Sequence, residues 1–165
     1  INLSASSSLI ELYCNNNDIV HLDVSMARRL EKLWCFNNHI EALDFTSTVE
    51  IRVIYCYNNL LKDLHLSSLS KLEMLSCRNN QLTNLDISSN GDLVILYCSQ
   101  NQISELDLSF APNLEALYCY SNRLNELDLS NNRALELVYC YGNRLIQVDV
   151  SKSPKLRQLR WKEIA

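Results

Sequence analysis

Hydrophobic and polar positions recur along this chain with a period of 21 residues. The stretch LEALYCYSNRLNELDLSNNRA, residues 114–134, returns with small changes from one end to the other. Each copy has six apolar positions, one of them cysteine and the others mostly leucine. One repeat, called a rung below, is too short to bury these side chains alone, so stacked rungs must share a continuous core. The period therefore predicts a solenoid of about eight rungs.

Cysteine and asparagine mark the rungs at a fixed separation of three residues. The alternation Leu117-Tyr118-Cys119-Tyr120 has period two, which predicts a strand with one face inward, and successive rungs would align these strands in a parallel sheet. The asparagine that follows can both donate and accept, so a buried column of amides is expected to satisfy loop backbone groups. The columns are Cys14, Cys35, Cys56, Cys77, Cys98, Cys119 and Cys140, and Asn17, Asn38, Asn59, Asn80, Asn101, Asn122 and Asn143.

An Asp-x-Ser or Asp-x-Thr pattern follows in most rungs. A column of carboxylates invites a calcium site, but one acid per rung supplies few ligands, and the spacing favours side-chain-to-backbone bonds in tight turns. The next four residues vary most and include Gly91, Pro112 and Pro154. They are too short for a helix of more than one turn and predict turns and short 3₁₀ segments. The acids are Asp23, Asp44, Asp86, Asp107, Asp128 and Asp149, with His65 in the remaining rung.

The repeat pattern covers residues 1–165 and predicts one domain. The first residues match the middle of a later repeat, so the chain starts in mid-repeat. Trp161 takes the cysteine position of the last rung and Ile164 its asparagine position. Residues 156–165 are therefore expected to form a degenerate last rung that begins a C-terminal cap. Exposed strand edges at both ends also raise the prospect of end-to-end self-association.

Charge and cysteine spacing exclude several classes of function. The net charge is −4, so the chain has no overall basic field that would attract nucleic acid. It contains no run of 18 apolar residues, so no membrane-spanning segment is predicted. Cysteines on neighbouring strands would lie about 4.8 Å apart, whereas a disulfide prefers Cβ atoms about 3.8 Å apart. We expect buried free thiols, and because no CxxC pair exists, we expect no metal site and no cofactor.

Catalysis has little support in the sequence. His21, His39 and His65 fall in different columns without a nucleophile beside them, and no glycine-rich phosphate loop exists among only two glycines. Thiols predicted to be buried are unreactive. The chain is therefore expected not to be an enzyme.

Aromatic residues concentrate one position before and one position after the cysteines, where side chains should face solvent. All eight tyrosines fall in these two columns. Stacking between neighbouring strands could explain one column, but a patch roughly 40 Å long is more typical of an interaction site. Ser76, Arg78 and Ser99 divide it into two halves, with Arg78 a candidate anchor for a carboxylate. The candidate partner-binding residues are Tyr13, Trp34, Phe36, Tyr55, Tyr57, Arg78, Tyr97, Tyr118, Tyr120, Tyr139 and Tyr141.

The repeat LxxLxCxxNxLxxLDxS resembles that of the bacterial, internalin-like leucine-rich repeat proteins with 21-residue repeats and a cysteine ladder. The resemblance implies an α/β-type leucine-rich repeat solenoid, a curved right-handed superhelix with its sheet on the concave face. It also implies a bacterial, often secreted or surface protein that binds other macromolecules in host interaction. Together with the aromatic columns, this favours a recognition module, associated with virulence, that binds a protein ligand through concave aromatic residues. Two alternatives stay open: a glycan-binding module, and the recognition domain of a larger intracellular effector or signalling protein.

Overall fold

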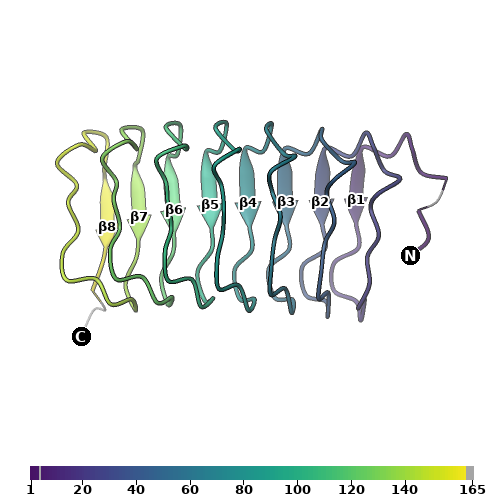
Figure 1. Cartoon of the computed structure of the whole chain (residues 1–165), viewed down its shortest axis with the longest axis horizontal. Coiled ribbons are helices and arrows are strands. Elements are labelled where there is room, and N and C mark those ends of the chain that lie inside the picture. Colours follow the sequence, from purple (N-terminus) through teal and green to yellow (C-terminus); the bar gives the residue numbers. More distant parts are fainter. Residues whose placement is uncertain (4, 163–165) are drawn as a thin grey trace.

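The structure is a computed structural model that describes residues 1–3 and 5–162. Its eight strands form one parallel sheet in chain order, and the chain makes one turn between each strand and the next (Figure 1). Residues pair in steps of 21, as in Leu96↔Leu117 and Leu117↔Val138. The strands are β1 (Glu11–Tyr13), β2 (Lys32–Trp34), β3 (Val53–Tyr55), β4 (Met74–Ser76), β5 (Ile95–Tyr97), β6 (Ala116–Tyr118), β7 (Leu137–Tyr139) and β8 (Gln158–Arg160). The predicted parallel-strand solenoid is confirmed.

The strands are shorter than the alternating pattern suggests, although the ladder of hydrogen bonds continues beyond them. The Cys119 amide donates to the Tyr139 carbonyl at 2.9 Å, and the Ser121 amide donates to the Tyr141 carbonyl at 2.9 Å. The chain then turns, because the residue two positions after each cysteine has a positive φ of 52–64°. Asparagine and glycine tolerate this left-handed conformation best. The residues are Asn16, Asn37, Asn58, Asn79, Gln100, Ser121 and Gly142.

The predicted asparagine column is confirmed in six rungs, where each amide connects consecutive rungs, whereas the side chain of the exposed Asn17 in the first rung donates only to the Cys14 and Asn15 carbonyls of its own rung. The Asn101 side-chain amide donates to the carbonyls of Cys77 and Cys98, both at 3.1 Å, and its oxygen accepts from the Leu82 amide at 3.0 Å. The same pattern recurs at Asn38, Asn59, Asn80, Asn122 and Asn143. These bonds satisfy backbone groups that the turning strands would otherwise bury without partners.

The interior contains the inward columns of leucine, isoleucine and cysteine. All seven cysteines are free and buried, as predicted. Burial raises the pKa of the Cys77 thiol to about 12 and that of Cys140, in the seventh rung, to about 11. The thiols are thus neutral, small and apolar, and they pack as core side chains. Trp161 packs partly buried against this core in the cysteine position of the last rung, whereas Ile164 lies outside the described residues.

The loops opposite the sheet contain turns where short 3₁₀ segments were predicted. The Ala27 amide donates to the Val24 carbonyl at 2.9 Å, and the Leu30 amide donates to the Ala27 carbonyl at 2.9 Å. A 3₁₀ helix needs such bonds on successive residues, whereas these lie end to end and form two separate turns. No described residue lies in a helix, and none belongs to a helix able to cross a membrane.

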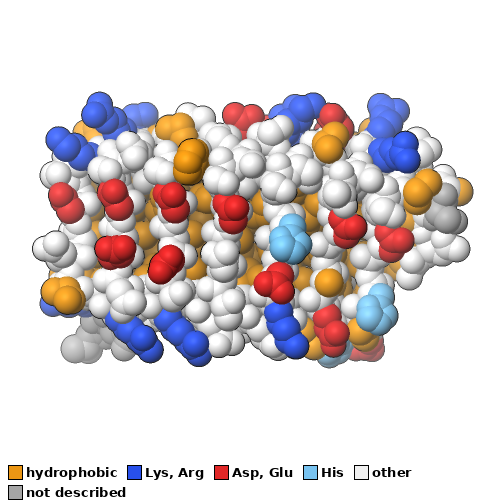
Figure 2. All heavy atoms as spheres, viewed as in Figure 1, with side chains coloured by type: hydrophobic (Ala, Val, Ile, Leu, Met, Phe, Trp, Pro, Cys, Tyr) orange, Lys and Arg blue, Asp and Glu red, His pale blue; other side chains and the backbone are white. Residues whose placement is uncertain are grey.

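The acidic column shapes the first of these turns. In six rungs an aspartate Oδ1 accepts from the backbone amide two residues later, at 2.8–2.9 Å, which confirms the predicted turn role. Acidic side chains accordingly cross the rungs in a row on the face opposite the sheet (Figure 2). The bonds from Ser130 lower the pKa of Asp128, although burial and the carboxylates of Asp107 and Asp149 act in the opposite direction.

Replacement of Asn101 by alanine tests the asparagine column. It would leave the Leu82 amide without a partner inside the fold, while the carbonyls of Cys77 and Cys98 would keep their bonds from Asn80 and Asn122. A stranded buried group costs about 1–3 kcal/mol, so we expect destabilisation of about that size in urea unfolding. The exposed Asn125 supplies the matched control, and Asn125→Ala should stay within about 0.5 kcal/mol of the parent. Equal effects of the two substitutions would contradict the assignment.

The thiol column predicts a pH dependence of stability. An unfolded thiol has a pKa of about 8.5. Since the folded pKa of Cys77 is raised, its stabilising contribution is complete below pH 8.5 and is lost as pH rises toward 12. The free energy of unfolding should therefore fall above pH 9. In Cys77→Ala the slope should be shallower by up to about 1.4 kcal/mol per pH unit. Identical slopes in parent and variant, with the folded thiols labelled within minutes, would show that the column is exposed.

Candidate partner-binding face

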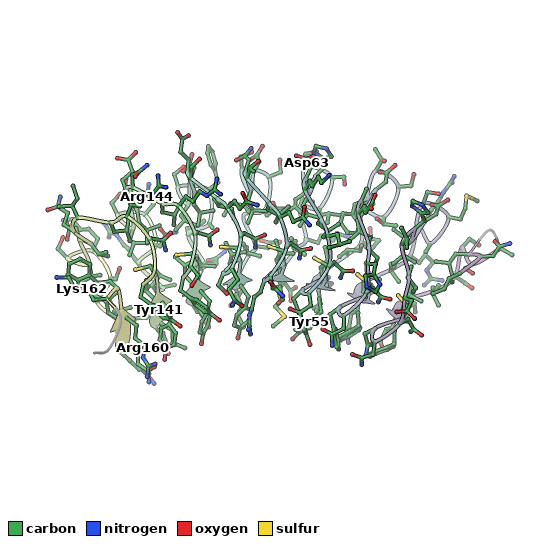
Figure 3. All side chains as sticks on the ribbon, turned by 90° about the horizontal axis from the view of Figure 1, so that it is seen from below. Tyr55, Asp63, Tyr141, Arg144, Arg160 and Lys162 are labelled. Carbon is green, nitrogen blue, oxygen red and sulfur yellow. The ribbon has the colours of Figure 1, made fainter. Side chains whose placement is uncertain are left out.

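The outward side chains of the eight strands form one surface, called the sheet face below. It comprises the residues three before, one before and one after each cysteine position. In Figure 3 Tyr55, Tyr141 and Arg160 project on the strand side, while Asp63 and Arg144 project on the opposite side. The positive φ after strands β1 to β7 directs the chain inward, and the next asparagine is buried beneath this face in five rungs, at Asn38, Asn59, Asn80, Asn101 and Asn122.

Side chains on the sheet face differ in exposure more than the sequence predicts. Tyr13 is 60% exposed, and the other candidate aromatics are half-buried. Ser76 and Ser99 were expected to face solvent, yet they are 6% and 0% exposed. This expectation was wrong because a small side chain between long ones lies below their level. Ser76 pairs with Tyr55 on one side and Tyr97 on the other.

Neighbouring rungs align the aromatic rings into stacks. The centroids of Tyr13 and Trp34 lie 4.2 Å apart, and those of Tyr120 and Tyr141 lie 4.8 Å apart with an interplanar angle of 4°. Stacked pairs also join Trp34 to Tyr55, Phe36 to Tyr57 and Tyr97 to Tyr118, while Tyr118 and Tyr139 meet edge to face. The predicted stacking between aromatic rings on neighbouring strands is therefore present. It also determines what a ligand would meet, because the ring faces cover one another and the ring edges point outward.

The outward edges present mainly hydrogen-bond donors and partial positive charge. The hydroxyl groups of Tyr57, Tyr120 and Tyr141 have no hydrogen-bond partner among the described residues. Burial is the main cause of a raised pKa at Tyr55 and Tyr118, so these hydroxyls stay protonated at neutral pH. Aromatic edges are the positive end of the ring quadrupole. The surface is thus suited to oxygen acceptors such as carbonyls and carboxylates.

Arg78 lies at the break between the two aromatic halves. It is exposed, and its Nε donates to the Gln100 side-chain oxygen at 2.6 Å. The terminal guanidinium nitrogens bond to no other part of the described chain, so they are free to form a paired contact with a carboxylate. Beside it, the Ser99 hydroxyl is buried and has no partner among the described residues.

Two rows of polar side chains escaped the sequence analysis. The left-handed asparagines beside the sheet face are linked from rung to rung, with Asn37 donating to Asn16 at 2.6 Å and Asn79 to Asn58 at 2.8 Å. The repeated Asn-Asn pairs were a usable signal, since asparagine tolerates positive φ. In the opposite loops, Asn90 and Asn132 donate to buried carbonyls of the preceding rung, from a position that other rungs fill with alanine, leucine, threonine or serine. Only the exposed row borders the sheet face.

The histidine and cysteine side chains of the described residues lie apart from one another or are buried. No group of three or more histidine, cysteine, aspartate or glutamate side chains among them is placed to hold a metal ion. His39 meets only the exposed Asp18 carboxylate, at 3.8 Å. The thiols are buried beneath the sheet.

Solved structures share this architecture. The chain superposes on the functional domain of InlJ from Listeria monocytogenes, described as including a cysteine ladder, with a TM-score of 0.93 and 32% identity over 94% of this chain and 35% of that one. The present chain is a leucine-rich repeat array of the cysteine-ladder type. The array also superposes on an internalin, InlF, from Listeria monocytogenes, with a TM-score of 0.83 and 22% identity over 96% of this chain and 48% of that one.

A leucine-rich repeat protein of Leptospira interrogans gives a TM-score of 0.87 and 22% identity over 94% of the array and 44% of its own length. At 22% identity these last two structures show the fold alone. The array spans less than half of each of the three structures. No protein-family model and no curated protein matches the chain. Leucine-rich repeat folds of this type are generally protein-interaction modules without enzymatic activity.

A double-mutant cycle on Tyr120 and Tyr141 tests the stacking of the rings. Each single alanine substitution and the double substitution would be compared with the parent in urea unfolding. Offset-stacked rings are coupled by about 0.5–1.5 kcal/mol, so we expect a coupling energy in that range. A coupling near zero would mean that the ring faces are open in solution, which would favour a surface for stacking on sugar rings.

Proposed function

We propose that this array is the recognition domain of a bacterial protein and binds a protein partner through its sheet face. One observation supports the proposal above all: every tyrosine of the chain lies on that face, while the inward positions of the same strands are aliphatic or cysteine. Stability alone would not require this segregation. Tyrosine and tryptophan give large contact areas at low entropic cost and dominate binding hot spots.

The orientation of the rings favours a protein over a glycan. Sugar rings stack on the flat faces of aromatic side chains, and in this array most of those faces are covered by the next rung. Ring edges and hydroxyl groups instead suit the carbonyl and carboxylate oxygens of a polypeptide. Arg78 adds a guanidinium for a paired contact with a carboxylate.

The same proposal includes the organisation of the domain and its location. Residues 1–165 would act as one recognition domain, curved with the sheet on its concave side, so that a partner contacts several rungs at once. Residues 156–165 would begin the C-terminal cap. We place the parent protein at the bacterial surface or in the secreted fraction, in a role associated with virulence. An attached catalytic or signalling domain in the full-length protein would favour the intracellular alternative.

A pull-down with a matched pair of variants tests the proposed face. Native array would be compared with the Tyr118→Ser, Tyr120→Ser, Tyr139→Ser, Tyr141→Ser variant as bait for host-cell surface and lysate fractions. Serine is chosen because it already occupies these columns at Ser76 and Ser99. We expect the native array to retain a protein that the variant does not retain. The affinity should fall by at least about 30-fold, since hot-spot tyrosines contribute about 2 kcal/mol or more each.

The control removes exposed apolar side chains from the opposite loops. Phe110 is 52% and Ile146 90% exposed, and a Phe110→Ala, Ile146→Ala variant should retain the partner. Thermal unfolding must show both variants folded at the assay temperature. Loss of the partner from the control, or its retention by the folded serine variant, would refute the proposed face. Binding abolished by deglycosylation of the target would favour the glycan alternative, and sedimentation of the bait alone tests end-to-end association.

A further inference from the structure

The sheet face repeats itself at a longer interval than the 21-residue rung. Every aromatic side chain of its first half returns as an aromatic side chain four rungs, or 84 residues, later. The pairs are Tyr13 and Tyr97, Trp34 and Tyr118, Phe36 and Tyr120, Tyr55 and Tyr139, and Tyr57 and Tyr141. The five residues of each half are called the first patch and the second patch below.

The cationic side chains at the C-terminal end of each patch recur at the same interval. The first patch ends at the fourth strand, where Arg78 follows Cys77; the second ends at the eighth, where Lys162 holds the equivalent position and Arg160 precedes it. Arg160 lies 4.9 Å above the Tyr139 ring, and the Lys162 ammonium lies 4.4 Å above the Trp161 ring at the end of the array. Each patch is therefore followed by at least one cation.

The same interval separates two ion pairs at the entry to the strands. Arg52 Nη1 lies 2.5 Å from a Glu73 carboxylate oxygen, and four rungs later Arg157 Nε lies 3.7 Å from Glu136. The acid and base exchange places between the two pairs, so the pairing recurs although the residues do not. Arg52 and Arg157 lie next to the sheet face, four positions before a cysteine position, and are already paired. On the sheet face itself Lys32 is paired with Glu11, so Arg78, Arg160 and Lys162 are the cations of its described residues without a carboxylate partner.

The charge of the sheet face is opposite to that of the whole chain. Its three columns contain four cationic side chains and one carboxylate, whereas the chain has a net charge of −4. The single carboxylate, Glu11, is already paired with Lys32 at 2.9 Å. The charge on this surface thus complements an acidic partner.

We propose that the sheet face comprises two equivalent subsites, four rungs apart, that bind two acidic side chains of one extended polypeptide segment. The inference rests on the proposed function, since it specifies the chemistry of the partner at the same face. In each subsite the tyrosine edges contact the segment, and the cation after the patch pairs with a carboxylate. Four strand spacings of about 4.8 Å separate the subsites by roughly 19 Å, which an extended chain spans in about six residues.

A displayed library of random 16-residue peptides, selected on the native array, tests the proposal. We expect enriched peptides to contain two aspartate or glutamate residues about six positions apart. Synthetic copies would then be titrated into Arg78→Gln, into Arg160→Gln, Lys162→Gln, and into the triple variant. Because the two contacts act on one ligand, loss of either subsite should weaken binding by about 10-fold or more, and loss of both by about 100-fold.

A variant that removes two charges from the opposite loops, as many as Arg160→Gln, Lys162→Gln, provides the control. Arg133→Gln, Arg144→Gln should leave the affinity within about twofold of the native array, since both side chains are exposed and neither belongs to the columns of the sheet face. An equal loss in this control would show nonspecific attraction and overturn the proposal. Enriched peptides that lack acids, or that need only one subsite, would also overturn it.

The outcomes separate this inference from the proposed function. Peptides that lose binding in the tyrosine-to-serine variant but ignore the cations would leave the sheet face as the recognition surface and refute the two acidic subsites. Selection of no peptide for this face, with polygalacturonate bound there instead, would replace the polypeptide by an acidic glycan. Selection of no ligand for the face in either form would refute the subsites, while the pull-down still decides the proposed function on its own.

Discussion

The spacing of adjacent parallel strands is the constraint on which this structure depends. Backbone hydrogen bonds hold neighbouring rungs about 4.8 Å apart, and every side chain then lies over its equivalent in the next rung. A residue type can therefore recur in a column only if two identical side chains are compatible at that distance. Leucine and neutral thiols do so by packing, and amides do so because they both donate and accept. The buried asparagine amides satisfy the hydrogen bonds of backbone groups at the turns that follow the strands, next to the packed apolar columns.

The same spacing decides what the surface can bind. Rings on adjacent strands lie at stacking distance, so their faces are used within the protein and their edges remain for a ligand. Stabilisation and recognition are therefore compatible properties of one set of side chains. The aromatic columns are interrupted where Ser76, Arg78 and Ser99 replace aromatic residues, and the free end of the Arg78 guanidinium lies at the surface there. The chemistry of the sheet face thus varies along the array while the core beneath it stays constant.

Much of this organisation could be predicted from the sequence because one period specifies every column. The inward leucines, the free thiols and the turns at Asp128 and its equivalents follow from residue type and spacing alone. Features that depend on neighbours in three dimensions could not be foreseen. Ser76 and Ser99 are buried by the height of adjacent side chains, and the direction of the ring faces follows from rotamers in contact. Separate turns occur where 3₁₀ segments were predicted, because the hydrogen bonds of these loops lie end to end and do not overlap.

Site-specific photocrosslinking would test the central claim, that the sheet face is the recognition surface, most directly. A photoreactive phenylalanine analogue would replace Tyr120 in one sample and Phe110, in the opposite loops, in another. With a partner retained by the native array, the account predicts a covalent adduct from position 120 and none from position 110. An adduct formed only from position 110 would contradict it and move the binding surface to the opposite side of the array.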